Sequence, residues 1–229
     1  MKVLVVAPHA DDETLGVGGT IARHTAEGDE VTVVVMTGPG EEPHPILPHS
    51  VWDTVRAEAK RACLVLGVKD LLFRELPAVL VPDQPVYKVN QEAISVLEDI
   101  EPDILYVPFP FDLHLDHRAI FYAFSVAWRP HSKVGAGIKE IYAYETLSET
   151  HWSPSYLEPG FTPNVFVDIS KTLEQKLSAM NCYQSQLQEE PHFRSLKALE
   201  ALATLRGSQM SMSAAEAFVM IRQVRRRKS

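Results

Sequence analysis

The sequence predicts an α/β fold in which a mostly parallel sheet carries helices on both faces. Through the first 130 residues, apolar runs of strand length alternate with amphipathic helical patterns, and this alternation is typical of parallel sheets. The chain has 229 residues, of which 45% are hydrophobic and 23% charged, so it can bury a core of its own. Because no internal repeat, low-complexity segment or linker divides it, we expect a single domain over residues 1–229.

Continuous apolar runs mark the expected strands, because a strand of a parallel sheet is buried on both faces. In chain order, these runs are Val3–Ala7, Val31–Met36, Leu71–Phe73 and Ile104–Val107. Further strands are expected at Ile138–Tyr144 and Val165–Ile169. Right-handed connections and the usual doubly wound topology place the first four in the order 3-2-1-4. The first and fourth strands are therefore expected to be neighbours.

Apolar residues at helical spacing mark the elements between these strands. Helices are expected at about Glu13–Glu27, Ser50–Leu66, Val86–Ile100 and Leu115–Trp128. The capping-box pattern from Ser50 to Asp53 starts the second helix and Gly67 ends it, whereas a proline stops each of the next two. From Ser170 onward we expect mostly helix.

Charge and cysteine usage exclude several classes of function. The formal net charge of −8 argues against a general nucleic-acid or anionic-membrane binder, and the short basic run Arg225–Lys228 is interpreted as a solvated helix end. Cys63 and Cys182 lie in apolar helical patterns without ligand spacing, which favours reduced core cysteines in a cytosolic protein. No apolar run approaches the length of about 18 residues that a membrane span needs. We therefore expect a cytoplasmic protein with no nucleic-acid or membrane partner.

Two clusters of histidines and acids follow the first and fourth strands. His9–Glu13 reads HADDE, and Asp112–His117 reads DLHLDH. Ligands of such sheets bind beyond the carboxyl ends of the strands, where the strand order reverses, so the two clusters should meet at one crevice. Either cluster alone is common, because acids suit the start of a helix and the second cluster could form a surface turn. Together, two imidazoles and a carboxylate predict a metal site with open positions, as catalytic zinc requires.

The first cluster lies within a longer motif. Residues 6–16 read VAPHADDETLG, and Gly18-Gly19-Thr20 follow. This stretch resembles the opening motif of the LmbE-like (PIG-L) family of zinc-dependent N-deacetylases, and Asp112–His117 resembles the second motif of that family. Ala10 stands where the family usually has proline, and weaker similarities extend to Ala215–Phe218. The resemblance implies a Rossmann-like sheet, in agreement with the fold predicted from the alternation of elements.

The resemblance also implies roles for individual residues. Three would bind Zn²⁺: His9, Asp12 and His117. Asp11 would be the general base that takes a proton from the attacking water. His114, oriented by Asp116 and favoured by that acid in its protonated form, would stabilise the oxyanion or protonate the leaving amine. Either Asp11 or His114 can return the proton to the amine. Glu13 would start the helix or support a ligand from behind.

The implied reaction is hydrolysis of the N-acetyl group of an N-acetylglucosamine-type sugar or sugar conjugate, a small molecule, to an amine and acetate. Gly38–Ser50 is interpreted as either a pocket wall or a plain surface loop. Arg56 is a candidate for binding a substrate anion or hydroxyl, although its spacing is not the one expected for the family. Buried packing is favoured over a sugar platform for the aromatic residues Trp152, Tyr156 and Phe161.

Other functions stay open. A zinc amidase of the same family could act on a larger amide-linked conjugate. The two-histidine, one-carboxylate pattern also fits iron(II) oxygenases, but these generally have all-β barrels. A non-catalytic nucleotide-binding module is disfavoured because Gly16, Gly18 and Gly19 fall within the first helix. The ligand set also accepts iron, cobalt or manganese, and the oligomeric state, a homo-oligomer included, stays open.

Overall fold

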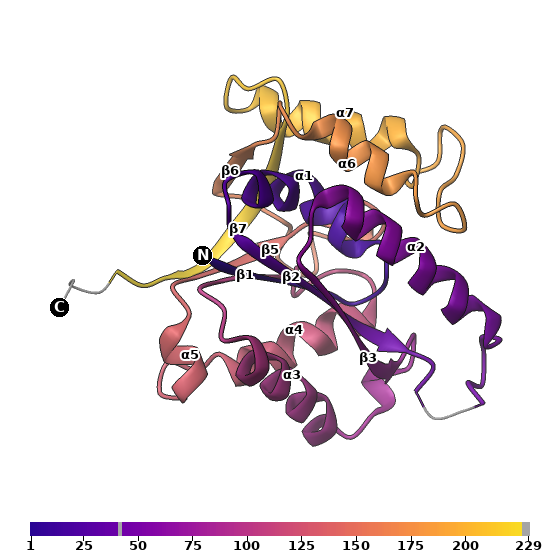
Figure 1. The fold of residues 1–229 in the computed structure, drawn as a ribbon, viewed down its shortest axis with the longest axis vertical. Coiled ribbons are helices and arrows are strands. Elements are labelled where there is room, and N and C mark those ends of the chain that lie inside the picture. The colour runs from indigo at the N-terminus through magenta and orange to yellow at the C-terminus, as the bar shows by residue number, and fades with distance from the viewer. Residues whose placement is uncertain (41–42, 226–229) are drawn as a thin grey trace.

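The fold is built around one mixed sheet. The computed structural model describes residues 1–40 and 43–225, and within them seven strands pair in the order β3-β2-β1-β4-β5-β7-β6 (Figure 1). The strands are β1 (Lys2–Ala7), β2 (Glu30–Gly38), β3 (Asp70–Pro77), β4 (Ile104–Pro108), β5 (Glu140–Tyr144), β6 (Val165–Asp168) and β7 (Ala215–Gln223). The first five pair in parallel, so the predicted α/β class and the order 3-2-1-4 are confirmed.

Helices cover both faces of the sheet, as predicted. They are α1 (Asp12–Ala26), α2 (Ser50–Leu66), α3 (Val86–Ile100), α4 (Leu115–Ala127), α5 (Lys133–Gly137), α6 (Leu173–Met180) and α7 (Leu196–Ser208), with the 3-10 turns η1 (Val81–Asp83) and η2 (Thr150–Trp152). Helices α1, α2, α6 and α7 lie on one side of the sheet, and α3, α4 and α5 lie on the other (Figure 1). In the described part of the chain, no helix is long and apolar enough to cross a bilayer.

Strand β1 contributes to two cores, one beneath each layer of helices. Val3 and Val5 pack in the cluster that contains residues of α1 and α2. Leu4 and Val6 pack in the cluster that contains residues of α3 and α4. Successive side chains of a strand point to opposite faces, so burial on both sides produces the continuous apolar run seen in the sequence.

The C-terminal part departs from the expectation of mostly helix after Ser170. Residues 215–223 form β7, which runs antiparallel to both β5 and β6 and lies between them. The strand begins Ala-Glu-Ala, which are good helix formers, so hydrogen bonding to two neighbouring strands outweighs the local preference. Arg225 follows this strand, so it does not belong to a helix end; Arg226–Lys228 lie outside the described residues.

The start of α2 also differs from the prediction. His49 is the residue at the N-cap, and no side chain accepts a capping hydrogen bond there. Ser50 already lies inside the helix, so the expected capping box is absent from this helix start. The predicted end is confirmed, because Gly67 adopts φ 77° and its N–H bonds back to the last turn.

Candidate metal centre and active site

The two histidine-containing clusters meet at the carboxyl ends of β1 and β4, which are adjacent in the sheet. Asp12 opens α1, and His117 lies in the first turn of α4. His9, Asp12 and His117 each offer one ligand atom, and these atoms lie within 4.8 Å of one another. Asp12 Oδ2 is 3.4 Å from His9 Nδ1 and 3.2 Å from His117 Nε2. The structure thus brings together the three residues predicted to bind a metal.

The ring of His117 is oriented by a buried carboxylate. Nδ1 donates a hydrogen bond to Asp112 Oδ2 at 2.8 Å, and Asp112 Oδ1 accepts one from Thr150 Oγ1 at 2.6 Å. With the proton on Nδ1, the lone pair of Nε2 lies opposite the Asp12 carboxylate, and Nε2 is buried without a hydrogen bond. Two electron-rich atoms at this distance are stabilised by a proton or a metal cation between them, so the donor set fits a metal ion.

The charges around this point also call for a cation. Asp11, Asp12 and Glu13 are all at most 2% exposed. Burial raises the pKa of Asp11 to about 8, and the charge of Asp12 adds to this effect, while Arg194 opposes it. Burial opposes the charge of Asp12 as well, but His117 and His9 hold its pKa well below the usual value. Three consecutive buried acids therefore depend on nearby positive charge, from protonated imidazoles or from a bound divalent ion.

Asp11 and Asp12 point in different directions, as predicted for consecutive residues. Asp11 has φ 117°, a conformation that non-glycine residues rarely adopt, and its N–H donates to Glu13 Oε2 at 3.2 Å. Glu13 Oε1 accepts hydrogen bonds from Thr14 Oγ1 and from Tyr183 Oη, both at 2.6 Å. Glu13 therefore holds the backbone of Asp11 in place through a carboxylate that Thr14 and Tyr183 fix in turn. Asp11 Oδ2 is buried without a hydrogen bond and lies 3.8 Å from Arg194 Nε.

The roles expected for His114 and Asp116 need correction. The Asp116 carboxylate accepts hydrogen bonds from His9 Nε2 at 2.9 Å, Val79 N at 2.6 Å and Val81 N at 3.1 Å. Burial lowers the pKa of His9, but the hydrogen bonds that Asp116 and Asp12 accept from it outweigh this effect and raise the pKa to about 9. The expected contact between the Asp116 carboxylate and His114 is thus replaced by one with His9.

His114 is instead held by backbone. It is the N-cap of α4, and its Nδ1 accepts the Asp116 N–H at 3.2 Å, so the proton of a neutral ring lies on Nε2. Burial lowers the pKa of His114 to about 4, and the charges of His9 and His117 lower it further. Burial and these charges therefore disfavour the protonated form of His114 that the sequence predicts. His9, His114 and Asp116 form a second group of metal-capable residues, but His114 Nδ1 and both Asp116 oxygens already accept hydrogen bonds.

A cavity of about 210 Å³ opens over these residues. Its floor contains the predicted metal ligands, together with Asp11 and His114. One wall is apolar and comes from β2, β3, α2 and the loop before α2; it consists of Val35, Leu47, Val51, Trp52, Val55 and Phe73. Leu47 belongs to Gly38–Ser50, so part of that segment is a pocket wall; Glu41 and Glu42 lie outside the described residues.

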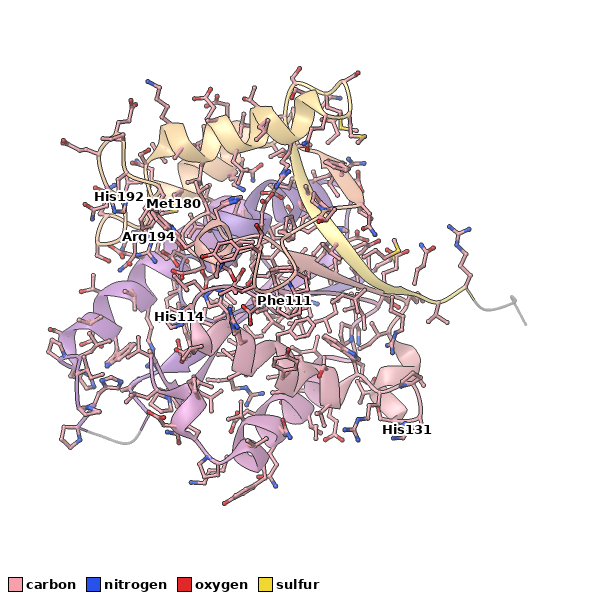
Figure 2. All side chains as sticks on the ribbon, turned by 180° about the vertical axis from the view of Figure 1, so that it is seen from behind. Phe111, His114, His131, Met180, His192 and Arg194 are labelled. Atoms are coloured by element: carbon pink, nitrogen blue, oxygen red, sulfur yellow. The ribbon has the colours of Figure 1, made fainter. Side chains whose placement is uncertain are left out.

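Polar side chains also line the cavity, and sequence reasoning missed most of them. They are Glu149, Gln186 and Arg194. Figure 2 shows Arg194 on the segment between α6 and α7, on the same side of the molecule as His114. Arg56 also lines the cavity, where its Nη2 donates to Glu75 Oε1 at 2.5 Å. Glu149 and Arg194 lie in irregular segments without a motif, so the sequence carries no signal for them. Asp112 could have been found, because carboxylates commonly orient metal-binding histidines.

The aromatic residues expected to be buried divide into two groups. Trp152 and Tyr156 are 60% and 85% exposed, so the expectation of buried packing is wrong for them. Phe161 packs edge-to-face against Phe109, with ring centroids 5.2 Å apart. Neither exposed residue lines the cavity.

Comparisons with known proteins agree on the fold and the family. A model of the PIG-L family, described as GlcNAc-PI de-N-acetylase, matches residues 4–128. The diacetylchitobiose deacetylase of Thermococcus kodakarensis is 30% identical over 217 residues, which cover 85% of this chain and 76% of that protein.

Solved structures share the fold at lower identity. N,N'-diacetylchitobiose deacetylase from Pyrococcus horikoshii has a TM-score of 0.75 at 23% identity and covers 96% of this chain and 83% of its own. A 4-carboxy-2-hydroxymuconate hydratase from Pseudomonas putida has a TM-score of 0.76 at 21% identity, over 100% of this chain and 99% of its own. Proteins with this fold thus catalyse different reactions, and the reaction of a given member must be argued from the residues of its site. Because the family model covers more than half of the sequence and both histidine-containing clusters, the chain belongs to the PIG-L family.

Proposed function

We propose that the protein is a zinc-dependent hydrolase that removes the N-acetyl group from an N-acetylglucosamine-type sugar or sugar conjugate, and that residues 1–229 form one domain. The observation that carries the proposal is the convergence of His9, Asp12 and His117, with His117 Nε2 facing the Asp12 carboxylate. The names of the relatives supply the reaction class, since they include deacetylases of diacetylchitobiose and of an acetamido-sugar inositol.

Two nitrogens and one oxygen are the donor types that catalytic zinc sites use. His9, Asp12 and His117 would hold the ion, with Asp112 and Asp116 fixing the two rings. A zinc ion in such a site lowers the pKa of water toward about 7 and polarises a carbonyl oxygen.

The residues of the chain supply the remaining chemistry. Asp11 Oδ2, buried and free of hydrogen bonds within the described residues, is the atom that accepts a proton from the attacking water. His114 Nε2–H donates a hydrogen bond to the acetamide oxygen as negative charge develops there. A neutral His114 has no acidic proton to spare, so Asp11 returns its proton to the leaving amine.

The rival readings find less support. An iron oxygenase of the all-β type does not match a parallel α/β sheet. In a nucleotide-binding module, phosphates would need bare N–H groups at the start of α1, where three buried acids stand. A zinc amidase acting on a larger conjugate shares all of the proposed chemistry and differs only in the group that is released.

The test is an acetate-release assay over a panel of N-acetylated sugars, with metal-stripped enzyme as the control. We expect acetate from at least one N-acetylglucosamine derivative, no acetate after stripping, and recovery when zinc is restored. Release of a larger acid from an amide conjugate, without acetate from any sugar, would select the amidase. No hydrolysis of any amide by the zinc-loaded protein would overturn the proposal.

A further inference from the structure

Two side chains of opposite charge line the cavity and belong to neither group of metal-capable residues: Glu149 and Arg194. Among the described residues, none donates a hydrogen bond to the Glu149 carboxylate, which is half-buried. Arg194 Nε is buried and lacks a hydrogen-bond partner, and the Asp11 carboxylate lies 3.8 Å from it, too far for a hydrogen bond. Polar groups removed from water without partners cost free energy, so both side chains retain hydrogen-bonding capacity that a ligand can satisfy.

Both residues are held in place by their surroundings. Glu149 N donates to Thr146 O at 2.9 Å, and Glu149 O accepts the Leu113 N–H at 3.4 Å. Arg194 N donates to His192 Nδ1 at 3.1 Å, and its Nη1 donates to Gln186 Oε1 at 3.0 Å. These hydrogen bonds fix the backbone of Glu149 and both the backbone and the guanidinium of Arg194. Groups held in place in this way lose less entropy on binding a ligand, which favours a binding role over a solvated surface role.

The part of the cavity lining that comes from β2, β3, α2 and the loop before α2 offers a complementary surface. It is apolar apart from Trp52, whose Nε1 is buried without a hydrogen bond, and Arg56, which is engaged by Glu75. A sugar ring has apolar C–H faces and a hydroxyl-bearing edge. The ring can place a face against the apolar wall and its edge toward Glu149 and Arg194.

We propose that Glu149 and Arg194 bind hydroxyl groups of the substrate sugar and so determine which N-acetylated amino sugars the enzyme accepts; this inference rests on the proposed deacetylase function. The carboxylate accepts from hydroxyl hydrogens and the guanidinium donates to hydroxyl oxygens. One negative and one positive charge balance each other at this wall. A neutral polyol matches that balance better than a second anionic substituent, which would meet Glu149 as well as Arg194.

The position of the pair along the chain adds support. All of the proposed metal-binding and proton-transfer residues fall within residues 4–128, the part that the family model matches, whereas Glu149 and Arg194 come after it. That division suits residues that select substrates.

The experiment compares Glu149→Gln and Arg194→Gln with the wild type on two kinds of substrate. N-acetylglucosamine and its 3-, 4- and 6-deoxy analogues probe the hydroxyl groups, and N-cyclohexylacetamide probes the reaction without them. We expect each variant to lose about 10–100-fold in kcat/KM for N-acetylglucosamine, mainly through KM, as for a lost hydrogen bond to a charged group. The deoxy analogue that lacks the bound hydroxyl should react equally well with Glu149→Gln and the wild type, and N-cyclohexylacetamide should not distinguish these two. Because Arg194 also lies 3.8 Å from the Asp11 carboxylate, Arg194→Gln is judged by its loss on N-acetylglucosamine in excess of its loss on N-cyclohexylacetamide.

Matched controls are Glu189→Gln and Arg129→Gln, which change exposed residues away from the cavity and should leave kcat/KM unchanged. Metal content and thermal midpoint are measured for every variant. Equal losses on all substrates, or no loss on any, in variants that keep their metal would overturn the inference while the deacetylase function stands. If the wild type releases no acetate from any sugar, the proposed function fails, and this inference fails with it.

Discussion

His117 Nδ1 donates a hydrogen bond to Asp112 Oδ2 at 2.8 Å, and Thr150 holds the other oxygen of the same carboxylate. Removing this carboxylate frees the ring to rotate and lets its proton move to Nε2, where the lone pair is needed. We expect Asp112→Ala to lower zinc affinity about 10–100-fold, as measured by competition with a chelator. Thr150→Val leaves the bond between His117 and Asp112 in place and should have a smaller effect on zinc affinity, although it also removes the hydrogen bond that Thr150 Oγ1 accepts from Thr146 N. Equal zinc affinity in Asp112→Ala and the wild type would show that the carboxylate does not orient the ligand.

Asp11 is separated from the metal-capable group by the direction of its side chain. Asp11→Asn keeps the size of the side chain and removes its ability to accept a proton, so turnover should fall about 10²–10⁴-fold. Zinc content should stay at that of the wild type, because His9, Asp12 and His117 remain. Metal analysis and acetate release on the same preparation check both points. Unchanged turnover would remove Asp11 as the base.

His114 combines a cap for α4 with a free Nε2–H donor, and two substitutions separate these functions. His114→Asn retains a capping oxygen but, being shorter, places no donor at the position of Nε2, whereas His114→Ala loses both the cap and the donor. Turnover should fall about 10²–10³-fold in both variants. Only His114→Ala should also lose about 1 kcal/mol of unfolding free energy, measured by denaturant titration. A bell-shaped pH profile whose acidic group vanishes in His114→Asn would instead identify His114 as the proton donor.

A bound metal ion should stabilise the fold, because its ligands come from two segments more than 100 residues apart. At a zinc concentration 100 times the dissociation constant, the stabilisation is about 2.7 kcal/mol. We therefore expect the Tm of metal-stripped protein to rise on addition of zinc, and His117→Ala to show little rise. The measurement is a thermal shift titration. A wild-type Tm that is insensitive to zinc would contradict the predicted site.

Lys176 and Glu216 form a buried ion pair behind α1, with Nζ 2.5 Å from Oε1. Glu216 also accepts the N–H groups of Gly19 and Thr20, at 2.9 and 2.7 Å. Lys176→Met leaves the carboxylate buried without its counterion and should cost about 3–5 kcal/mol. At this chain length, Tm should drop by about 2–4 °C for each kcal/mol. Lys197→Met breaks an exposed pair with Glu190 and should change Tm little; equal changes would show that burial does not matter here.

The sequence predicted those parts of the fold that a single local pattern determines. Val3–Ala7 is apolar throughout because β1 is covered on both faces, and this run together with the helical pattern after it was enough to predict the parallel sheet. The strand order then placed His9 and His117 at one crevice. The two clusters are far apart in the sequence: His9 and Asp116, which share a hydrogen bond, are 107 positions apart.

Other features depend on tertiary contacts that no local pattern reveals. Residues 215–223 begin with helix formers, yet they become β7 because two strands are available to pair with them. Asp116 lies two residues after His114 in the sequence, but its carboxylate reaches His9 because Val79 and Val81 donate their N–H groups from the segment after β3. Arg194 lines the cavity from a segment without regular structure, where helical or strand periodicity cannot predict which side chains point inward.

The place of β7 between β5 and β6 affects how the chain can fold during its synthesis. Until residues 215–223 have left the ribosome, the outer edge of β5 and both edges of β6 lack hydrogen-bonding partners. Exposed edges of this kind invite pairing with other nascent chains. The strands that bear the histidines can assemble early, whereas this end of the sheet must wait for its last strand and is the part most in need of a chaperone.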